Sequence, residues 1–175
     1  MYSVLVRRLV RMLTVLVIAC AIGFAAPAQT NAPPYRIHST LPAFSIRLID
    51  GGYFNTVRIR KGSPSVLMLV SPDCHHCSAL VRELKDSLAA ISNVNFVLAS
   101  PPMPFEEIQK FAVVNGIARQ GQLKIGQDTA FFFGSFFHAG TVPFVVVYDR
   151  QKKWFSTLSA MNHISELLAE LRKVP

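Results

Sequence analysis

A run of five consecutive apolar residues, Val66 to Val70, constrains the fold more than any other feature of the chain. The run is continuous rather than alternating, which is the pattern of a central strand covered on both faces. A second pattern follows closely, with apolar residues recurring at helical spacing from Leu80 to Ile91. A buried strand followed by an amphipathic helix predicts an α/β fold.

The rest of the chain extends this alternation of strands and helices. We expect further strands over 44–48, 54–59, 94–99, 144–148 and 154–158, and helices over 105–114, 129–137 and 164–171. Asp128 is expected to cap the helix over 129–137, whose five phenylalanines are expected to pack mainly into the core. Residues 117–127 carry no readable pattern. The order predicts one α/β domain over 41–175, a mixed central sheet with helices on both faces.

Residues 1–28 have the pattern of a secretory signal peptide. Three arginines precede an uncharged apolar run over 12–24, and Ala26-Pro27-Ala28 offers small residues at the two positions that a signal peptidase reads. The apolar run is short for a membrane span, which needs about 20 residues. We therefore expect export and cleavage after Ala28.

Cys20 provides an alternative reading of the same leader. The stretch Val17-Ile18-Ala19-Cys20 resembles a bacterial lipobox, in which the cysteine is acylated. Retention of the leader as a membrane anchor is a further alternative. All three outcomes place the domain in the periplasm or cell envelope, with residues 29–40 as a linker between the leader and the domain.

The formal net charge is +8, and three of these charges belong to the leader, at Arg7, Arg8 and Arg11. The other basic residues are scattered, with short clusters only over 58–61 and 150–153. A nucleic-acid site would show a basic stripe or a motif, so no nucleic-acid partner is expected. A solvated basic surface is the favoured interpretation, although it can bias encounters with acidic partners or anionic headgroups.

Cys74 and Cys77 are the only cysteines outside the leader. They follow the predicted buried strand and fall in the first turn of the predicted helix. Residues three apart on a helix share one face, so a disulfide between them is geometrically available. The helix N-terminus favours a thiolate, which makes Cys74 the expected nucleophile and Cys77 the expected resolving thiol. The cysteine pair would be the redox group, with no other cofactor.

Other interpretations of the pair are weaker but stay open. A static disulfide would remove little chain entropy, because the loop is so short. A metal chaperone for Cu(I) could use both cysteines and a histidine, yet a closed metal site normally needs a second ligand pair, so no metal is expected. A binding module without redox activity is the third alternative.

The segment Val66 to Cys77, the helix after it and the later Thr141-Val142-Pro143-Phe144 resemble the thioredoxin superfamily. The resemblance covers roughly residues 41–172 and is closest to the exported TlpA-like and redoxin-like thiol–disulfide oxidoreductases of bacteria. It implies a thioredoxin-like fold, in which Pro143 is a cis-proline facing the cysteines and Val142 offers its backbone to an extended substrate. It also implies protein thiols and disulfides as partners, a membrane-embedded thiol reductase as electron donor, and a monomer.

Several residues depart from the usual pattern of that superfamily. Asp73 replaces a tryptophan, Met68 replaces a buried carboxylate, and His75-His76 replaces Gly-Pro between the cysteines. A histidine directly before the second cysteine resembles the DsbA oxidants. His76 can stabilise the Cys74 thiolate, which would make the disulfide more oxidising, and two histidines add pH sensitivity near neutrality.

Overall fold

The computed structural model of the protein describes residues 32–175. The predicted signal peptide over 1–28 and the lipidation candidate Cys20 lie outside the described residues. Within residues 32–175, no helix is both long enough and apolar enough to cross a membrane.

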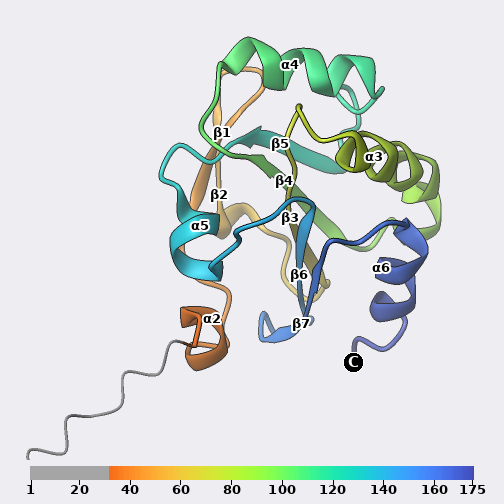
Figure 1. Ribbon diagram of the computed structural model, residues 1–175. Coiled ribbons are helices and arrows are strands. Elements are labelled where there is room, and N and C mark those ends of the chain that lie inside the picture. The colour runs from red at the N-terminus through yellow and green to blue at the C-terminus, as the bar shows by residue number, and fades with distance from the viewer. Residues whose placement is uncertain (1–31) are drawn as a thin grey trace, which may run out of the picture. The chain divides into compact units, whose positions relative to one another are not determined.

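Seven strands form one mixed sheet in the order β2-β1-β5-β4-β3-β6-β7 (Figure 1). The strands are β1 (Ser45–Leu48), β2 (Tyr53–Asn55), β3 (Ser65–Leu69), β4 (Asn95–Ser100), β5 (Leu123–Gln127), β6 (Phe144–Tyr148) and β7 (Trp154–Ser159). Strands β3, β4 and β5 run parallel to one another, whereas β6 is antiparallel to β3. The predicted mixed central sheet is confirmed.

Helices cover both faces of this sheet. They are α2 (Pro34–Ile37), α3 (His75–Ser87), α4 (Phe105–Val114), α5 (Phe132–Phe137) and α6 (Ile164–Leu171), with 3-10 segments at Thr56–Arg58 and Leu88–Ile91. Apolar residues of α3, α4 and α6 share one core cluster with the sheet. Residues of α2 and α5 belong to the cluster on the other face. The predicted α/β class with flanking helices is therefore confirmed.

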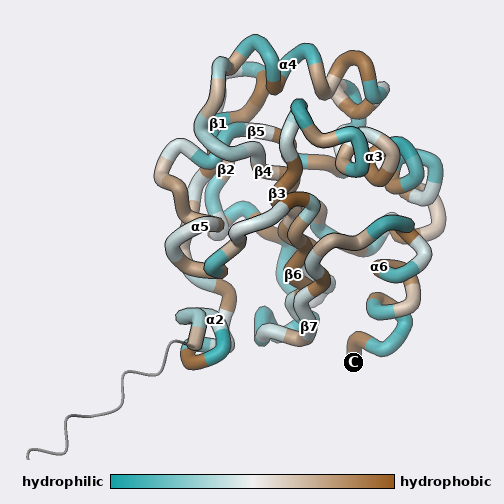
Figure 2. Tube along the Cα trace, in the orientation of Figure 1, coloured by the Kyte–Doolittle hydropathy of each residue, from teal (hydrophilic) through white to brown (hydrophobic). Residues whose placement is uncertain are grey.

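The central strand β3 is buried over its whole length, which explains its unbroken apolar sequence. Val66 and Met68 pack in the cluster of α3, whereas Leu67 and Leu69 pack in the cluster of α5. Figure 2 shows the same concentration of apolar residues along the central strands. Each such side chain contributes about 1.5–3 kcal/mol on burial, so β3 is a rigid support for the loop that follows it.

Strand β5 lies in the stretch where the sequence shows no pattern. Only Leu123 and Ile125 of its five residues have large apolar side chains, so the alternation is too short to stand out in the sequence. Gly126 is required by close packing, because a Cβ there would collide with the backbone carbonyl of Arg47 on β1. Two predicted boundaries also differ: the strand expected over 54–59 ends at Asn55, and the helix expected over 129–137 begins at Phe132.

The short helix α2 lies in the segment predicted as a linker. Tyr35 is 4% exposed, and its ring lies 5.5 Å from the rings of both Phe137 and Trp154. Thr40 forms a β-bridge with Lys153. The packed region therefore starts at α2, before the predicted domain boundary at residue 41.

Candidate active site

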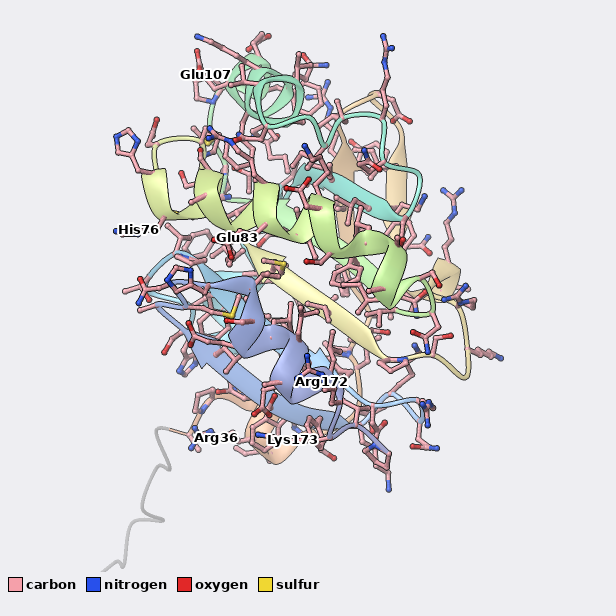
Figure 3. The ribbon with its side chains drawn as sticks, turned by 90° about the vertical axis from the view of Figure 1, so that its right-hand side faces the viewer. Arg36, His76, Glu83, Glu107, Arg172 and Lys173 are labelled. Carbon is pink, nitrogen blue, oxygen red and sulfur yellow. A yellow bond between two sulfur atoms is a disulfide. The ribbon has the colours of Figure 1, made fainter. Side chains whose placement is uncertain are left out.

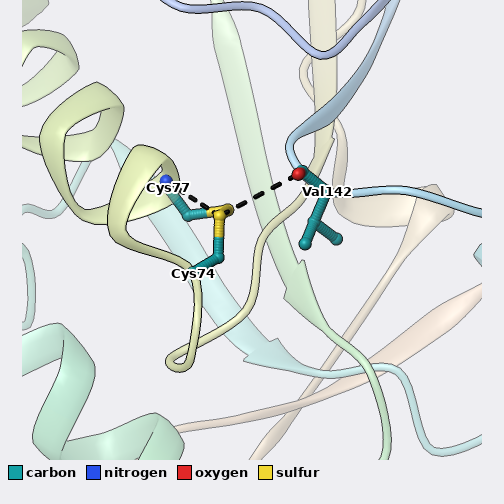
Figure 4. The surroundings of a disulfide bond; sticks show 3 residues. All are labelled: Cys74, Cys77 and Val142. Carbon is teal, nitrogen blue, oxygen red and sulfur yellow. Dashed lines mark hydrogen bonds between the residues drawn. A yellow bond between two sulfur atoms is a disulfide. The ribbon is translucent and has the colours of Figure 1, made fainter.

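Strand β3 and helix α3 place the two cysteines at the carboxyl end of the central strand. The chain turns after β3, and Cys74 is the N-cap of α3. Its Sγ accepts a hydrogen bond from the backbone N–H of Cys77 at 3.1 Å (Figure 4). The first turn of α3 contains no acidic residue. A sulfur at this position meets the free amides and the positive end of the helix dipole, which together favour a thiolate.

Cys74 and Cys77 form a disulfide, with their Cα atoms 5.2 Å apart. The two residues differ in burial: Cys77, in the first turn of α3, is fully buried in the core, whereas Cys74 is only partly buried. An incoming sulfur can therefore contact Cys74, while Cys77 is shielded behind it. This difference favours the predicted roles, Cys74 as the attacking thiol and Cys77 as the resolving one.

The loop before β6 faces the disulfide from the other side. The carbonyl oxygen of Val142 lies 3.9 Å from the Cys74 Sγ (Figure 4). The Val142–Pro143 peptide bond is cis, as the resemblance implies. The pairing of β6 with β3 sets this arrangement, because Phe144 pairs with Leu69 at the end of the central strand. The sheet register thus brings two predicted site segments together.

The two histidines of the motif lie at the surface. His75 and His76 are exposed in the first turn of α3, and Figure 3 shows His76 pointing away from the body of the molecule. Within residues 32–175, neither ring makes a hydrogen bond or an ion pair in this disulfide form. The modulating role of His75 and His76 stays a prediction. Met68 is fully buried in the same core cluster as Cys77, so the strand position beneath the disulfide carries an apolar side chain.

Helix α5 is held at its start by Asp128, which is 1% exposed. The Asp128 carboxylate accepts hydrogen bonds from the backbone N–H groups of Phe132 and Phe133, at 2.9 and 2.8 Å. Phe131 occupies the N-cap position, and Asp128 supplies the acceptors from three residues before it. The predicted contribution of Asp128 to capping is confirmed, because its carboxylate pairs with otherwise free helix amides. Because α5 leads directly into the Val142 loop, Asp128 also helps to position that loop.

A hollow of about 370 Å³ lies between α5 and the carboxyl end of β3. Its lining is mainly apolar and includes Leu69, Phe131, Phe133, Gly134, Thr141 and Val142. Val142 belongs both to this hollow and to the surroundings of the disulfide. The hollow therefore adjoins the site of the cysteines through Val142.

The aromatic segment divides its residues between core and surface, which the sequence does not resolve. Phe133 and Phe137 are fully buried as predicted, but Phe131 is 58% exposed at the rim of the hollow. Its backbone is left-handed, with φ of 52°. Gly134 makes room for the Phe131 ring, because a Cβ at that position would collide with it. In the sequence, the only indication of this contact is the glycine at position 134, three residues after Phe131.

Side chains that could bind a metal are not clustered in the described part of the chain. Among residues 32–175, no three His, Cys, Asp or Glu side chains are grouped so that they could hold a metal ion. The two cysteines and their neighbouring histidines point in different directions, since Cys77 is buried and both histidines are exposed.

Comparison with known proteins rests on structure alone, since no family model and no curated protein matches the sequence. A secreted Mycobacterium tuberculosis disulfide oxidoreductase homologous to E. coli DsbE aligns with a TM-score of 0.64 and 19% identity, over 75% of this chain and 96% of that one. A thioredoxin-family thiol:disulfide interchange protein from Chlorobium tepidum aligns with a TM-score of 0.65 and 14% identity, over 83% and 99%.

A third solved structure comes from Streptococcus pneumoniae. Its exposed lipoprotein thioredoxin, Etrx1, aligns with a TM-score of 0.63 and 13% identity, over 76% of this chain and 100% of that one. All three alignments cover nearly the whole of the compared structure, so the likeness extends to the complete fold. The protein has a thioredoxin-like fold, the fold of these thiol–disulfide oxidoreductases.

Proposed function

We propose that this protein is a thiol–disulfide oxidoreductase of the cell envelope that exchanges electrons with protein thiols through Cys74 and Cys77. The observation that carries the proposal is the disulfide at the start of α3, with Cys74 accessible and Cys77 fully buried. Two solved structures with the same fold support it, because one is named a disulfide oxidoreductase and the other a thiol:disulfide interchange protein.

The exchange proceeds through a mixed disulfide. In the reducing direction, the Cys74 thiolate attacks one sulfur of a substrate disulfide and releases the other sulfur as a thiolate, which takes up a proton. Cys77 then loses its proton and attacks the Cys74 sulfur, which closes the Cys74–Cys77 disulfide and releases the second substrate thiol. Two electrons pass to the substrate, and the reverse sequence oxidises a substrate dithiol.

The surroundings of Cys74 favour an extended apolar segment of a protein as the substrate. Val142 lies beside the Cys74 sulfur and also lines the hollow under α5. A chain that presents its sulfur to Cys74 can place a neighbouring apolar side chain against Phe131 in that hollow. Val142 and Pro143 are thus the proposed substrate-binding residues.

Location in the cell envelope is supported by the leader pattern of residues 1–28. Two of the aligned structures are named as a secreted protein and an exposed lipoprotein. Fusion of residues 1–28 to a reporter that is active only outside the cytoplasm tests the proposal. Loss of a palmitate label in Cys20→Ala would identify the lipidated form, and a reporter that stays silent would exclude export.

Insulin reduction by a dithiol tests the redox activity. The wild-type protein should accelerate the reaction, Cys74→Ser should return it to the uncatalysed rate, and Cys77→Ser should accumulate a mixed disulfide through Cys74. Because Cys77 is fully buried, Cys77→Ala is the matched variant, and near-ultraviolet circular dichroism shows whether either variant is folded. Trapping through Cys77 in Cys74→Ser would reverse the assigned roles.

Failure of the wild-type protein in this assay separates the alternatives. A folded protein whose disulfide never exchanges with glutathione would be a binding module without redox activity. Stoichiometric Cu(I) binding by the reduced protein, with no acceleration of insulin reduction, would instead identify a metal chaperone.

A further inference from the structure

Basic residues that are scattered in the sequence come together on one side of the molecule. The register places Tyr148 opposite Ser65, so the turn after β6 lies at the start of β3, whereas Cys74 follows the end of β3. In Figure 1, this turn, α2 and the C-terminus lie on the side away from α4. We call this surface the basic side, and its exposed members are Arg36, Arg60, Lys61, Arg150, Lys153 and Arg172.

Contacts between distant segments hold the basic side together. The half-buried Lys152 donates hydrogen bonds from its Nζ to the carbonyl oxygens of Arg60 and Ser63, at 3.0 and 2.9 Å. Arg150 and Arg172 line one shallow hollow together with Pro64. These contacts join the loop before β3, the β6–β7 turn and the end of α6 into one surface.

Helix α2 adds Arg36 to the same surface. The Arg36 guanidinium lies 6.0 Å from the centre of the Trp154 ring, at the start of β7. Figure 3 shows Arg36 at the same end of the molecule as Arg172 and Lys173, away from Glu107 on α4. The basic side therefore extends from α2 to the C-terminus.

The positive charge of this surface is not neutralised by the acidic residues near it. Among residues 32–175, none of the six exposed cations forms an ion pair. The Asp149 carboxylate accepts hydrogen bonds from the backbone N–H groups of Gln151 and Lys153. Glu170 is paired with Lys173. The Arg60 guanidinium donates hydrogen bonds to Ser63 Oγ and to the Ser92 carbonyl oxygen, which are neutral acceptors. Within the described chain, the charges of all six cations are therefore left unpaired and available to a negatively charged partner.

We propose that the basic side binds the anionic headgroups of a lipid bilayer and thereby holds Cys74 on the side of the domain away from the membrane. The cations are spread over four separate segments instead of lining one pocket, which suits an extended charged surface. The described chain starts at Ala32, just before α2, so the residues that precede it join the domain at the basic side. This inference does not depend on the redox activity.

Vesicle binding by the full-length chain tests the proposal. Sedimentation is compared between phosphatidylcholine vesicles and vesicles in which roughly a third of the lipid is phosphatidylglycerol. The leader is present in every variant, so its own binding is common to all of them. The wild-type protein should bind the anionic vesicles more tightly, and the excess should disappear at high ionic strength, because salt screens exposed charges.

Two matched double variants separate the basic side from net charge. Lys153→Gln with Arg172→Gln removes two cations of the basic side, neither of which makes a side-chain hydrogen bond within residues 32–175. Each cation near an anionic surface contributes about fivefold in partitioning, so the loss of both should lower binding about 25-fold. The control pair, Lys110→Gln with Arg47→Gln, removes the same charge near α4 and should lower binding less than about twofold.

Trp154 reports the orientation of the bound protein, because it is the only tryptophan and lies beside Arg36. A nitroxide on the lipid headgroup should quench its fluorescence when anionic vesicles are present. Equal losses in the two double variants, an unquenched Trp154, or equal binding to neutral and anionic vesicles would each overturn the proposal. Capture of an acidic protein by the basic side without vesicle binding would also overturn it.

Discussion

Removal of the Asp128 carboxylate should destabilise the protein, because this buried group caps the start of helix α5. Asp128 is 1% exposed and accepts two backbone hydrogen bonds, at 2.9 and 2.8 Å. In Asp128→Ala, the buried N–H of Phe133 and the part-buried N–H of Phe132 lose their acceptor. An unpaired buried donor costs about 1–3 kcal/mol, and a part-buried one costs less. Release of the buried carboxylate offsets part of that cost. We expect the free energy of unfolding to fall by about 3 kcal/mol.

Urea denaturation of the disulfide form, followed by circular dichroism, measures this loss. Asp149→Ala is the matched control, because the Asp149 carboxylate also accepts two backbone hydrogen bonds but lies in an exposed turn. The control should lose less than about 1 kcal/mol, since water replaces the missing acceptor. Equal losses in the two variants would refute the reasoning, because burial would then contribute nothing.

The same variant links the cap to the proposed function. Because α5 lines the hollow and leads into the Val142 loop, Asp128→Ala should also raise the KM for insulin. Its reaction with glutathione should change little, since the small disulfide needs only the Cys74 sulfur. An unchanged KM in a destabilised variant would show that α5 takes no part in substrate binding.

Two further predictions concern potential and specificity. The reduction potential of the Cys74–Cys77 pair should be higher than that of thioredoxin, which is about −270 mV, and His76→Pro should lower the potential of the pair. Equilibration with glutathione, followed by thiol trapping, measures the potential of the wild-type protein and of the variant. A wild-type value at or below about −270 mV would contradict the prediction. Phe131→Ser should raise the KM for insulin roughly fivefold, as expected for one aromatic contact, without changing the glutathione reaction. Gly134→Ala should act in the same direction, because its Cβ displaces the Phe131 ring; equal effects on both substrates would contradict this role.

Local sequence patterns were sufficient to predict strand β3 and helix α3, the two elements that position the cysteines. The unbroken apolar run of β3 and the helical period of α3 both record burial against neighbouring elements, so they are visible in a single sequence. The bounds of α4 and β6 agree with the predicted ranges for the same reason. Asp128 is readable because capping is a local interaction between a side chain and the next turn.

Other elements depend on partners that are distant in the sequence. Strand β5 has a polar and glycine-containing sequence, and it is a strand because β4 and β1 pair with its two edges. Helix α2 is a single turn in a proline-rich segment, and it is held by the packing of Tyr35 against Phe137 and Trp154. Isolated helices of this length are unstable, so no local pattern can predict them.

The sequence by itself determined the position of the Cys74–Cys77 pair, after a buried strand and at the start of a helix. The tertiary structure decided what surrounds that pair. Val142 lies 68 positions from Cys74 in the sequence, and only the pairing of β6 with β3 brings its carbonyl to the sulfur. The hollow beside Phe131 and the basic side arise in the same way, from the strand order and register of the whole sheet. Periodicity records which residues are buried, but the packing of all the elements together selects which buried and exposed residues become neighbours.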